Sequence, residues 1–159
     1  MKKRPVRKAT RLENYDYSQP GYYYVTVCAE DRKPILGHVT KSDEAHQSSV
    51  ILYRAGIVTE DAIRAIPTVY PGVRVEKYVI MPNHFHLILS FSETGRPLPN
   101  LSQVVQQTKR RVSMVLGKPI WQAHYYDRVI RGDADFQAVW TYIDNNPTKW
   151  SLDKYYNEG

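Results

Sequence analysis

Short runs of β-branched and aromatic residues alternate with polar segments along the chain. Such side chains fit a pleated, half-buried surface, so these runs predict four strands, at 22–28, 73–80, 84–91 and 125–131. A shorter run at 35–39 is a candidate partner for the first strand. The polar stretch 41–49 is expected to be a loop.

Apolar residues spaced three and four apart predict three helices between these strands. The first carries an apolar stripe over 57–66 and is expected to end at Pro67, which cannot continue the hydrogen-bond ladder. The second follows Asn100, which with the glutamine three residues later resembles a capping box. The third has Asp133 as a candidate N-cap and stops at Pro147.

The order of elements is a strand pair, a helix, a strand pair, a helix, a strand and a helix. Helices interspersed with a mostly antiparallel sheet indicate an α+β sandwich, most simply a ferredoxin-like one with packed helices. No repeat or low-complexity linker interrupts the 159 residues. We therefore expect a single domain over 1–159, with a basic N-terminal arm at 1–14 and a short C-terminal tail at 148–159.

The charge balance points to an anionic partner. The formal net charge is +6 and the isoelectric point is about 9.4. Much of the excess precedes the first acidic residue, Glu13, and this arm is either a phosphate contact or a solvated tail. The basic residues of the arm that are candidate DNA contacts are Lys2, Lys3, Arg4, Arg7 and Lys8.

Several classes of protein are disfavoured by composition. No apolar stretch approaches the roughly 18 to 20 residues that span a bilayer, and the basic N-terminus lacks the apolar region of a secretory signal. We expect no membrane partner and a cytoplasmic location. Cys28 is the single cysteine, which excludes an internal disulfide and a multi-cysteine zinc site.

Two histidines lie two residues apart within the predicted strand 84–91. Side chains alternate along a strand, so His84 and His86 share one face while Phe85 points to the other. This places two imidazoles about 7 Å apart along the strand, where they can converge on one cation. Two histidines without a ligand are the alternative, since the H-x-H pattern is common.

The last predicted helix carries a tyrosine and an asparagine that share a face. Tyr142 and Asn146 are four residues apart, and Tyr142 lies off the apolar stripe, so burial does not explain it. Asn146 precedes Pro147, and its amide oxygen is a suitable ligand for Mg²⁺ or Mn²⁺. From spacing alone, a tyrosine at the rim and an asparagine that ends the helix are the favoured explanation, since Tyr142 is one of 13 tyrosines.

Together these segments resemble a known family, the REP-associated tyrosine transposases within the single-tyrosine HUH transposases. The segments that carry the resemblance follow one another in the family's order over nearly the whole chain. They are RLENYDYSQPGYYYVTVC (11–28), EKYVIMPNHFHLIL (76–89), WQAHYYDRVIR (121–131) and YIDNNPTKW (142–150). The combination of MPNHxH with the downstream YIxxNP is highly specific.

The resemblance implies a ferredoxin-like fold and a metal-dependent endonuclease and strand transferase acting on single-stranded DNA. His84 and His86 match the histidine pair, Tyr142 matches the nucleophile that forms a 5′-phosphotyrosine, and Asn146 matches the third metal ligand, which is a glutamine in some relatives. It also implies Mg²⁺ or Mn²⁺ as the cofactor, hairpins of extragenic palindromes as the DNA, and a monomer or a homodimer.

Further residues are candidates for binding the DNA. Basic side chains on the middle helix are expected to contact phosphates, and aromatic side chains near the fourth strand are expected to stack on bases, although core packing explains one or two of the aromatic ones as well. These candidates are Lys109, Arg110, Arg111, Trp121, Tyr125 and Tyr126.

Two other functions fit parts of the sequence. A catalytically silent DNA-binding regulator derived from a transposase would share the fold, and a metal-dependent hydrolase would use water in place of tyrosine. No dedicated base for the phenol of Tyr142 is evident, and His124 is only a candidate. A covalent protein–DNA adduct separates these functions.

Overall fold

The computed structural model of the protein describes residues 15–41 and 48–150. Its elements, in chain order, are β1 (Gly21–Cys28), the 3-10 turn η1 (Glu30–Arg32), β2 (Gly37–Lys41), β3 (Ser48–Leu52), α1 (Arg54–Val69), β4 (Val73–Met81), β5 (His84–Phe91), α2 (Leu101–Leu116), β6 (Tyr126–Ile130) and α3 (Gly132–Asn145). No helix within these ranges is long and apolar enough to cross a bilayer.

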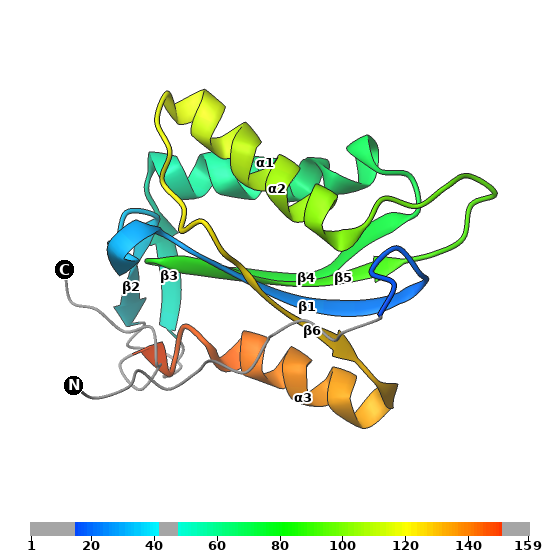
Figure 1. Cartoon of the computed structure of the whole chain (residues 1–159). Helices are drawn as coiled ribbons and strands as arrows, with labels where there is room; N and C mark the ends of the chain where they lie inside the picture. Colours follow the sequence, from blue (N-terminus) through cyan, green and yellow to red (C-terminus); the bar gives the residue numbers. More distant parts are fainter. Residues whose placement is uncertain (1–14, 42–47, 151–159) are drawn as a thin grey trace, which may run out of the picture.

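Four antiparallel strands form the central sheet in the order β4-β5-β1-β6 (Figure 1). The two middle strands are the most apolar, and every residue of β5 is buried. Because β1 is followed by α1 and β4, and β5 by α2 and β6, the chain traces two βαβ-like halves. The predicted α+β, ferredoxin-like sandwich is confirmed.

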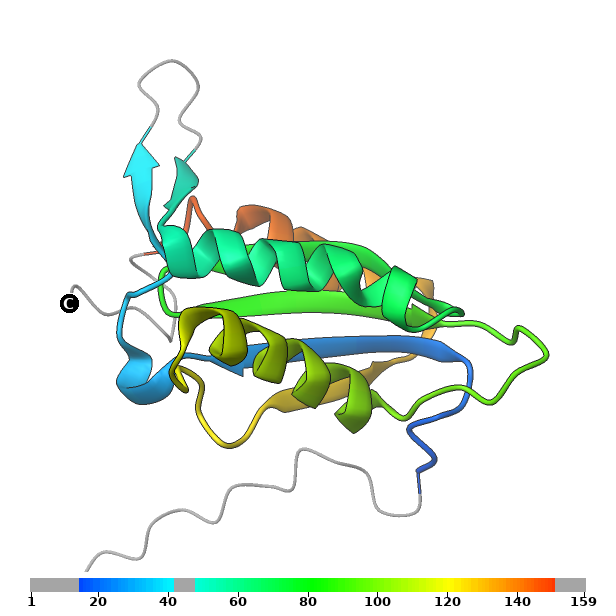
Figure 2. The same cartoon turned by 90° about the horizontal axis from the view of Figure 1, so that it is seen from above.

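Helices cover both faces of the sheet. Figures 1 and 2 show α1 and α2 side by side on one face and α3 alone on the opposite face. The capping box predicted at the start of α2 is present, since Asn100 accepts from the backbone N–H of Gln103 and Gln103 accepts from the backbone N–H of Asn100. The left-handed Gly117, at φ 76°, ends the helix.

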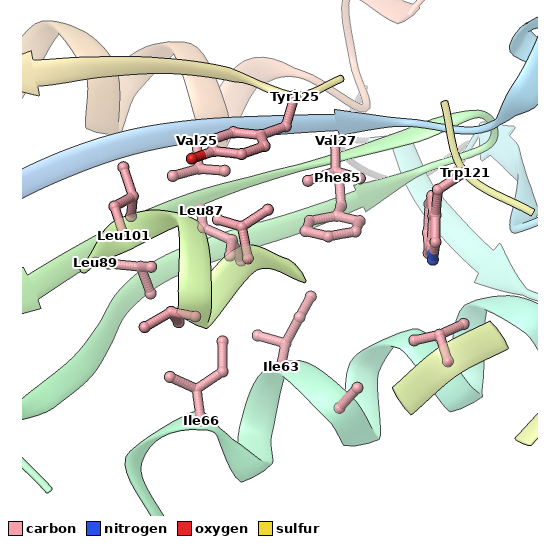
Figure 3. Packing of buried hydrophobic residues seen from close by; sticks show 14 of the residues in the cluster. Val25, Val27, Ile63, Ile66, Phe85, Leu87, Leu89, Leu101, Trp121 and Tyr125 are labelled. Carbon is pink, nitrogen blue, oxygen red and sulfur yellow. The ribbon is translucent and has the colours of Figure 1, made fainter. Parts of the chain in front are cut away.

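The main hydrophobic core lies between the sheet and the α1–α2 layer. Phe85, Leu87 and Leu89 of β5 point toward Ile63 and Ile66 of α1 in Figure 3. Each such side chain contributes about 1.5–3 kcal/mol by leaving water. A smaller cluster lies under α3 on the other face and consists of Ile88, Ile130, Val139 and Ile143, with partly buried aromatics around it.

Several local predictions are wrong. The short strand expected at 35–39 does not pair with β1, because β2 pairs with β3 in a separate ribbon that extends from one end of the sandwich (Figure 2). The stretch 41–49 is not all loop: residues 41, 48 and 49 belong to these two strands, and residues 42–47 lie outside the described ranges. α1 continues through Pro67 to Val69, because a proline near the helix end costs few hydrogen bonds. α3 begins at Gly132, with Arg131 rather than Asp133 as its N-cap.

Candidate active site

The two histidines of β5 converge on the face of the sheet that α3 covers. Strand alternation puts His84 and His86 opposite to Phe85 and Leu87, as expected, and both imidazoles are fully buried. The rings tilt toward one another, with their centroids 4.7 Å apart and their planes at 72°. Their Nε2 atoms are consequently only 3.2 Å apart.

Each imidazole is held by its other nitrogen, Nδ1. The side-chain oxygen of Asn83 lies 2.8 Å from Nδ1 of His84. The hydroxyl oxygens of Thr26 and Tyr24 lie 2.7 and 3.0 Å from Nδ1 of His86, and the ring of Tyr24 stacks on the ring of His86. Partners of this kind fix the orientation of histidines that bind metals.

These three supporting residues were not identified from the sequence. Thr26 and Tyr24 reach His86 because β1 pairs with β5 in a register that sets Thr26 directly opposite His86. Periodicity reports which residues of one strand share a face but not which residue of another strand lies opposite. The position of Asn83 directly before the histidines was the one available signal for its role.

The tyrosine of the third helix meets this face, and the asparagine four residues later caps the C-terminal end of the helix. The ring of Tyr142 lies 5.5 Å from the ring of His86, edge to face, and its side chain is 42% exposed. The ring of Trp150, eight residues on, lies 6.0 Å from the ring of His84. In sequence, Asn146 is midway between Tyr142 and Trp150, and it is 2% exposed.

The amide of Asn146 has one unsatisfied end. Its nitrogen donates to the carbonyl of Tyr142 at 3.1 Å, whereas its Oδ1 is buried with no hydrogen-bond partner in the described part of the chain. A buried polar atom without a partner costs free energy and calls for a specific explanation. A role as a ligand oxygen, in a segment whose two ends, Tyr142 and Trp150, contact the histidine rings, is such an explanation.

The donor set fits a small divalent cation. Two nitrogens at about 2.1 Å from one ion lie about 3.2 Å apart when the angle at the ion is near 100°, which is the Nε2 separation found between His84 and His86. No group of three His, Cys, Asp or Glu residues that could bind a metal occurs in the described ranges, so the histidine pair would be completed by another kind of donor, such as an amide oxygen. Asn146 has such an oxygen.

Two ion pairs connect α3 with the sheet beside the histidines. Lys77 of β4 pairs with Asp144, and its ammonium lies 4.4 Å from the centre of the Trp140 ring. Arg128 of β6 donates to Asp135 at 2.7 Å, and this hydrogen bond holds the pKa of that carboxyl below its usual value. The positive charges of this face were not singled out in the sequence.

Three of the predicted DNA contacts are buried in the structure. Trp121 and Tyr125 belong to the main core, where the ring of Trp121 packs against Phe85 (Figure 3). Lys109 is also buried, and its ammonium donates to the carbonyls of Gln122 and Ala123 at 2.8 and 3.4 Å. Burial lowers the pKa of Lys109, and this lysine supports the loop before β6 in place of a phosphate.

The other predicted contacts fall in three places. Arg110 and Arg111 are exposed on α2, on the opposite side of the sheet from the histidines. Tyr126 is half-buried on the histidine face, directly across β1 from His86, because both pair with Thr26. The arm residues Lys2 to Lys8 lie outside the described residues, and the candidate base His124 is exposed just before β6.

Comparisons with known proteins agree with this architecture. No protein-family model matches the chain. An uncharacterised protein of Haemophilus influenzae is 27% identical over 173 residues, which cover 94% of this chain and 93% of that protein. The sequence similarity therefore extends over most of the length of both chains.

Two solved structures are similar in fold. A REP-associated tyrosine transposase bound to a REP hairpin superposes with a TM-score of 0.65 at 21% identity, over 91% of this chain and 76% of that one. A candidate transposase from Deinococcus radiodurans gives a TM-score of 0.50 at 16% identity, over 85% of this chain and 97% of that one. The resemblance seen in the motifs is therefore matched in three dimensions: this chain has the fold of the REP-associated tyrosine transposases.

Proposed function

We propose that this protein is a single-tyrosine HUH transposase, a metal-dependent endonuclease and strand transferase for single-stranded DNA. The observation that carries the proposal is that His84 and His86 set their Nε2 atoms 3.2 Å apart on the face that Tyr142 contacts, four residues before Asn146, whose buried Oδ1 has no hydrogen-bond partner among the described residues. Buried donors beside a half-exposed nucleophile suit a substrate that enters from solvent.

The cofactor of the proposed reaction is Mg²⁺ or Mn²⁺. His84 and His86 would bind it through Nε2 and Asn146 through Oδ1. When bound, such an ion polarises a phosphate and offsets the negative charge that develops on its oxygens. The imidazoles are rigid, since their strand is buried throughout and their Nδ1 atoms are engaged. This rigidity fixes the donors before the DNA arrives.

The chemical step belongs to Tyr142. Its Oη attacks the scissile phosphorus, a phosphorus–oxygen bond to Tyr142 forms, and the bond to the 3′-oxygen breaks. The phenolic proton leaves to solvent, and the departing 3′-oxygen takes up a proton to become a hydroxyl. The products are a 5′-phosphotyrosine and a free 3′-OH. A second 3′-OH can then displace the tyrosine without ATP, since the phosphodiester energy is conserved in the adduct.

The proposed substrate is a single strand that folds into a palindromic hairpin. The net charge of +6 favours a nucleic acid partner, and the fold neighbour was solved with a REP hairpin. Arg110, Arg111 and the N-terminal arm remain the candidate phosphate contacts, and Tyr126 is the candidate base contact nearest the histidines. The contact between His86 and Tyr142 within one chain supports a site built from a single chain, in a monomer or in each subunit of a homodimer.

The test is a comparison of two tyrosine variants on a labelled hairpin oligonucleotide with Mg²⁺ or Mn²⁺. The wild type is expected to give cleavage and an adduct that survives denaturation, and Tyr142→Phe neither. Since Tyr142 is 42% exposed, the free energy of unfolding of Tyr142→Phe should stay within about 1 kcal/mol of the wild-type value. The matched control is Tyr22→Phe, which alters a tyrosine that is 44% exposed and should keep full activity.

Each rival function predicts a different result in this assay. If the protein is a hydrolase that uses water as the nucleophile, the Tyr142→Phe variant would still cleave the hairpin. A silent DNA-binding regulator would bind the hairpin without cleavage even as wild type. Retained adduct formation by Tyr142→Phe would move the nucleophile to another tyrosine, and Tyr126 would be the next to replace.

A further inference from the structure

Asn83 occupies a fully buried position in the two-residue turn between β4 and β5. The backbone of this turn is itself fixed, because the carbonyls of Asn83 and Pro82 accept from the N–H groups of Ala29 and Leu36 at 2.8 and 2.9 Å. The side chain of Asn83 therefore has little freedom, and its two ends meet two different partners.

The orientation of this amide follows from the partner on its nitrogen side. Nδ2 of Asn83 lies 3.2 Å from the carbonyl oxygen of Arg32, which can only accept. The NH₂ end must face Arg32, so the Oδ1 end faces His84 at 2.8 Å. Oδ1 is an acceptor only, and Nδ1 of His84 must carry a proton to bond with it.

An unusual backbone segment presents that carbonyl. Asp31 and Arg32 have φ values of 56° and 52°, which place two non-glycine residues in the left-handed region. Hydrogen bonds from Arg32 N–H to Ala29 and from Lys33 N–H to Glu30 close the turn around them. Residues in such conformations persist only where their surroundings impose them, and they concentrate at functional sites.

We infer that Asn83 is a positioning residue that keeps the proton of His84 on Nδ1, so that the Nε2 lone pair of His84 faces the cation site. A neutral imidazole carries one proton, and a ring that is protonated on Nε2 cannot bind a metal through that atom. The use of this lone pair rests on the function proposed above, whereas the position of the proton does not.

The partner histidine is not preset in the same way. Nδ1 of His86 faces the hydroxyls of Thr26 and Tyr24, which can each donate or accept. Because Nε2 of His84 carries a lone pair, Nε2 of His86 donates its proton to it across the 3.2 Å contact. Nδ1 of His86 is then an acceptor, and Thr26 donates to it. Binding a cation requires the proton of His86 to move to Nδ1, where Thr26 can accept it.

The first measurement is the position of these protons in the metal-free protein, from long-range ¹H–¹⁵N NMR of the histidine rings at a pH where both are neutral. The wild type is expected to show His84 protonated on Nδ1 and His86 on Nε2. Addition of Mg²⁺ should move the proton of His86 to Nδ1 and leave that of His84 in place. His84 protonated on Nε2 in the wild type would overturn the inference without any variant.

Three variants then separate positioning from general support of the turn. Asn83→Leu removes both ends of the amide, and it should mix the two tautomers of His84 and weaken the binding of Mn²⁺ alone by about 10- to 100-fold. Asn83→Asp keeps an acceptor toward His84 and should keep its tautomer. Pro82→Ala alters the same turn without touching the amide, and it should leave the tautomer and the Mn²⁺ affinity within about two-fold of wild type.

The outcomes distinguish this inference from the function on which it rests. A folded Asn83→Leu with the wild-type tautomer and Mn²⁺ affinity would show that Asn83 has no positioning role. If tautomer and affinity depend on Asn83 but the wild type forms no DNA adduct, the positioning role stands and the transposase function falls. If Asn83→Leu does not fold, the NMR spectra of the wild type and of Asn83→Asp still show whether an acceptor at position 83 keeps the proton of His84 on Nδ1.

Discussion

Replacing Asn146 by leucine should separate stability from metal binding in a way that a purely structural residue would not. The side chain is 2% exposed, and its Oδ1 has no hydrogen-bond partner within the described chain. Leucine has a similar size and removes that buried oxygen. It also removes the hydrogen bond from Nδ2 to the carbonyl of Tyr142.

The expected change in the metal-free protein follows from two opposing contributions. A buried acceptor without a partner costs about 1–3 kcal/mol, and the lost hydrogen bond contributed about 1 kcal/mol. Asn146→Leu should therefore be at least as stable as the wild type, by up to about 2 kcal/mol. At about 2–4 °C per kcal/mol for a chain of this size, its melting temperature should rise by as much as about 8 °C.

Metal should reduce or reverse this difference in stability. At an Mn²⁺ concentration of 100 times the dissociation constant, a folded protein gains about 2.7 kcal/mol, or roughly 5–11 °C. Loss of one of three ligands that weakens binding at least about tenfold would reduce the gain of Asn146→Leu to about 1.4 kcal/mol or less. Without metal, the melting temperature of Asn146→Leu should be at or above that of the wild type, and it should rise less when Mn²⁺ is added.

Thermal unfolding with and without Mn²⁺ measures both quantities. The matched control is Asn145→Leu, the same change at the exposed preceding position, which should alter neither the metal-free stability by much nor the Mn²⁺ response. An undiminished Mn²⁺ response in Asn146→Leu would remove Asn146 from the site. A metal-free variant less stable than the wild type by 2 kcal/mol or more would show that Oδ1 already has a partner.

Two further predictions concern charges outside the proposed site. Lys109→Met leaves the carbonyls of Gln122 and Ala123 without their donor, so it should lower the free energy of unfolding in urea by about 1–3 kcal/mol. It should leave the slope of log affinity for DNA against log salt concentration unchanged. Arg110→Met should reduce that slope by about 0.9 and leave the free energy of unfolding unchanged. Equal salt-dependence slopes for the wild type, Lys109→Met and Arg110→Met would exclude Arg110 as a phosphate contact. Asp135→Asn should cost about 1 kcal/mol or less at neutral pH. Because Arg128 lowers the pKa of Asp135 in the folded state, this difference should vanish as the pH falls from about 4 through that lower pKa, and a difference that grows in acid would contradict the ion pair.

Much of the proposed site was predictable because each part of it obeys a short-range rule. The two-residue period of a strand placed His84 and His86 on one face, and the four-residue spacing of a helix placed Tyr142 and Asn146 on one face. The order of strands and helices led to the antiparallel sandwich. These rules act within one element and need no knowledge of its neighbours.

The misassigned DNA contacts show where such rules fail. Lys109 lies four residues after Val105 and three before Val112, so it belongs to the buried stripe of α2, and its positive charge obscured that position. Trp121 and Tyr125 lie in the segment before β6, although a strand was predicted from residue 125, and periodicity gives no face in such a segment. The support of His86 by Thr26 depends on strand register, which only the folded sheet determines.

The structure divides the proposed site into a rigid part and a part that can move. His84 and His86 lie in a strand with all eight residues buried, between two hydrogen-bonded neighbours, whereas α3 packs on the sheet through the small cluster around Ile88 and Ile143. Local opening costs less where fewer apolar contacts are buried, so α3 can separate from the sheet at a lower free energy than β5 can leave it. This division suits a covalent mechanism. In the proposed reaction the two histidines would stay in place through both phosphoryl transfers, while Tyr142, with Asn146 at the end of the same helix, would accommodate the exchange of one 3′-OH for another.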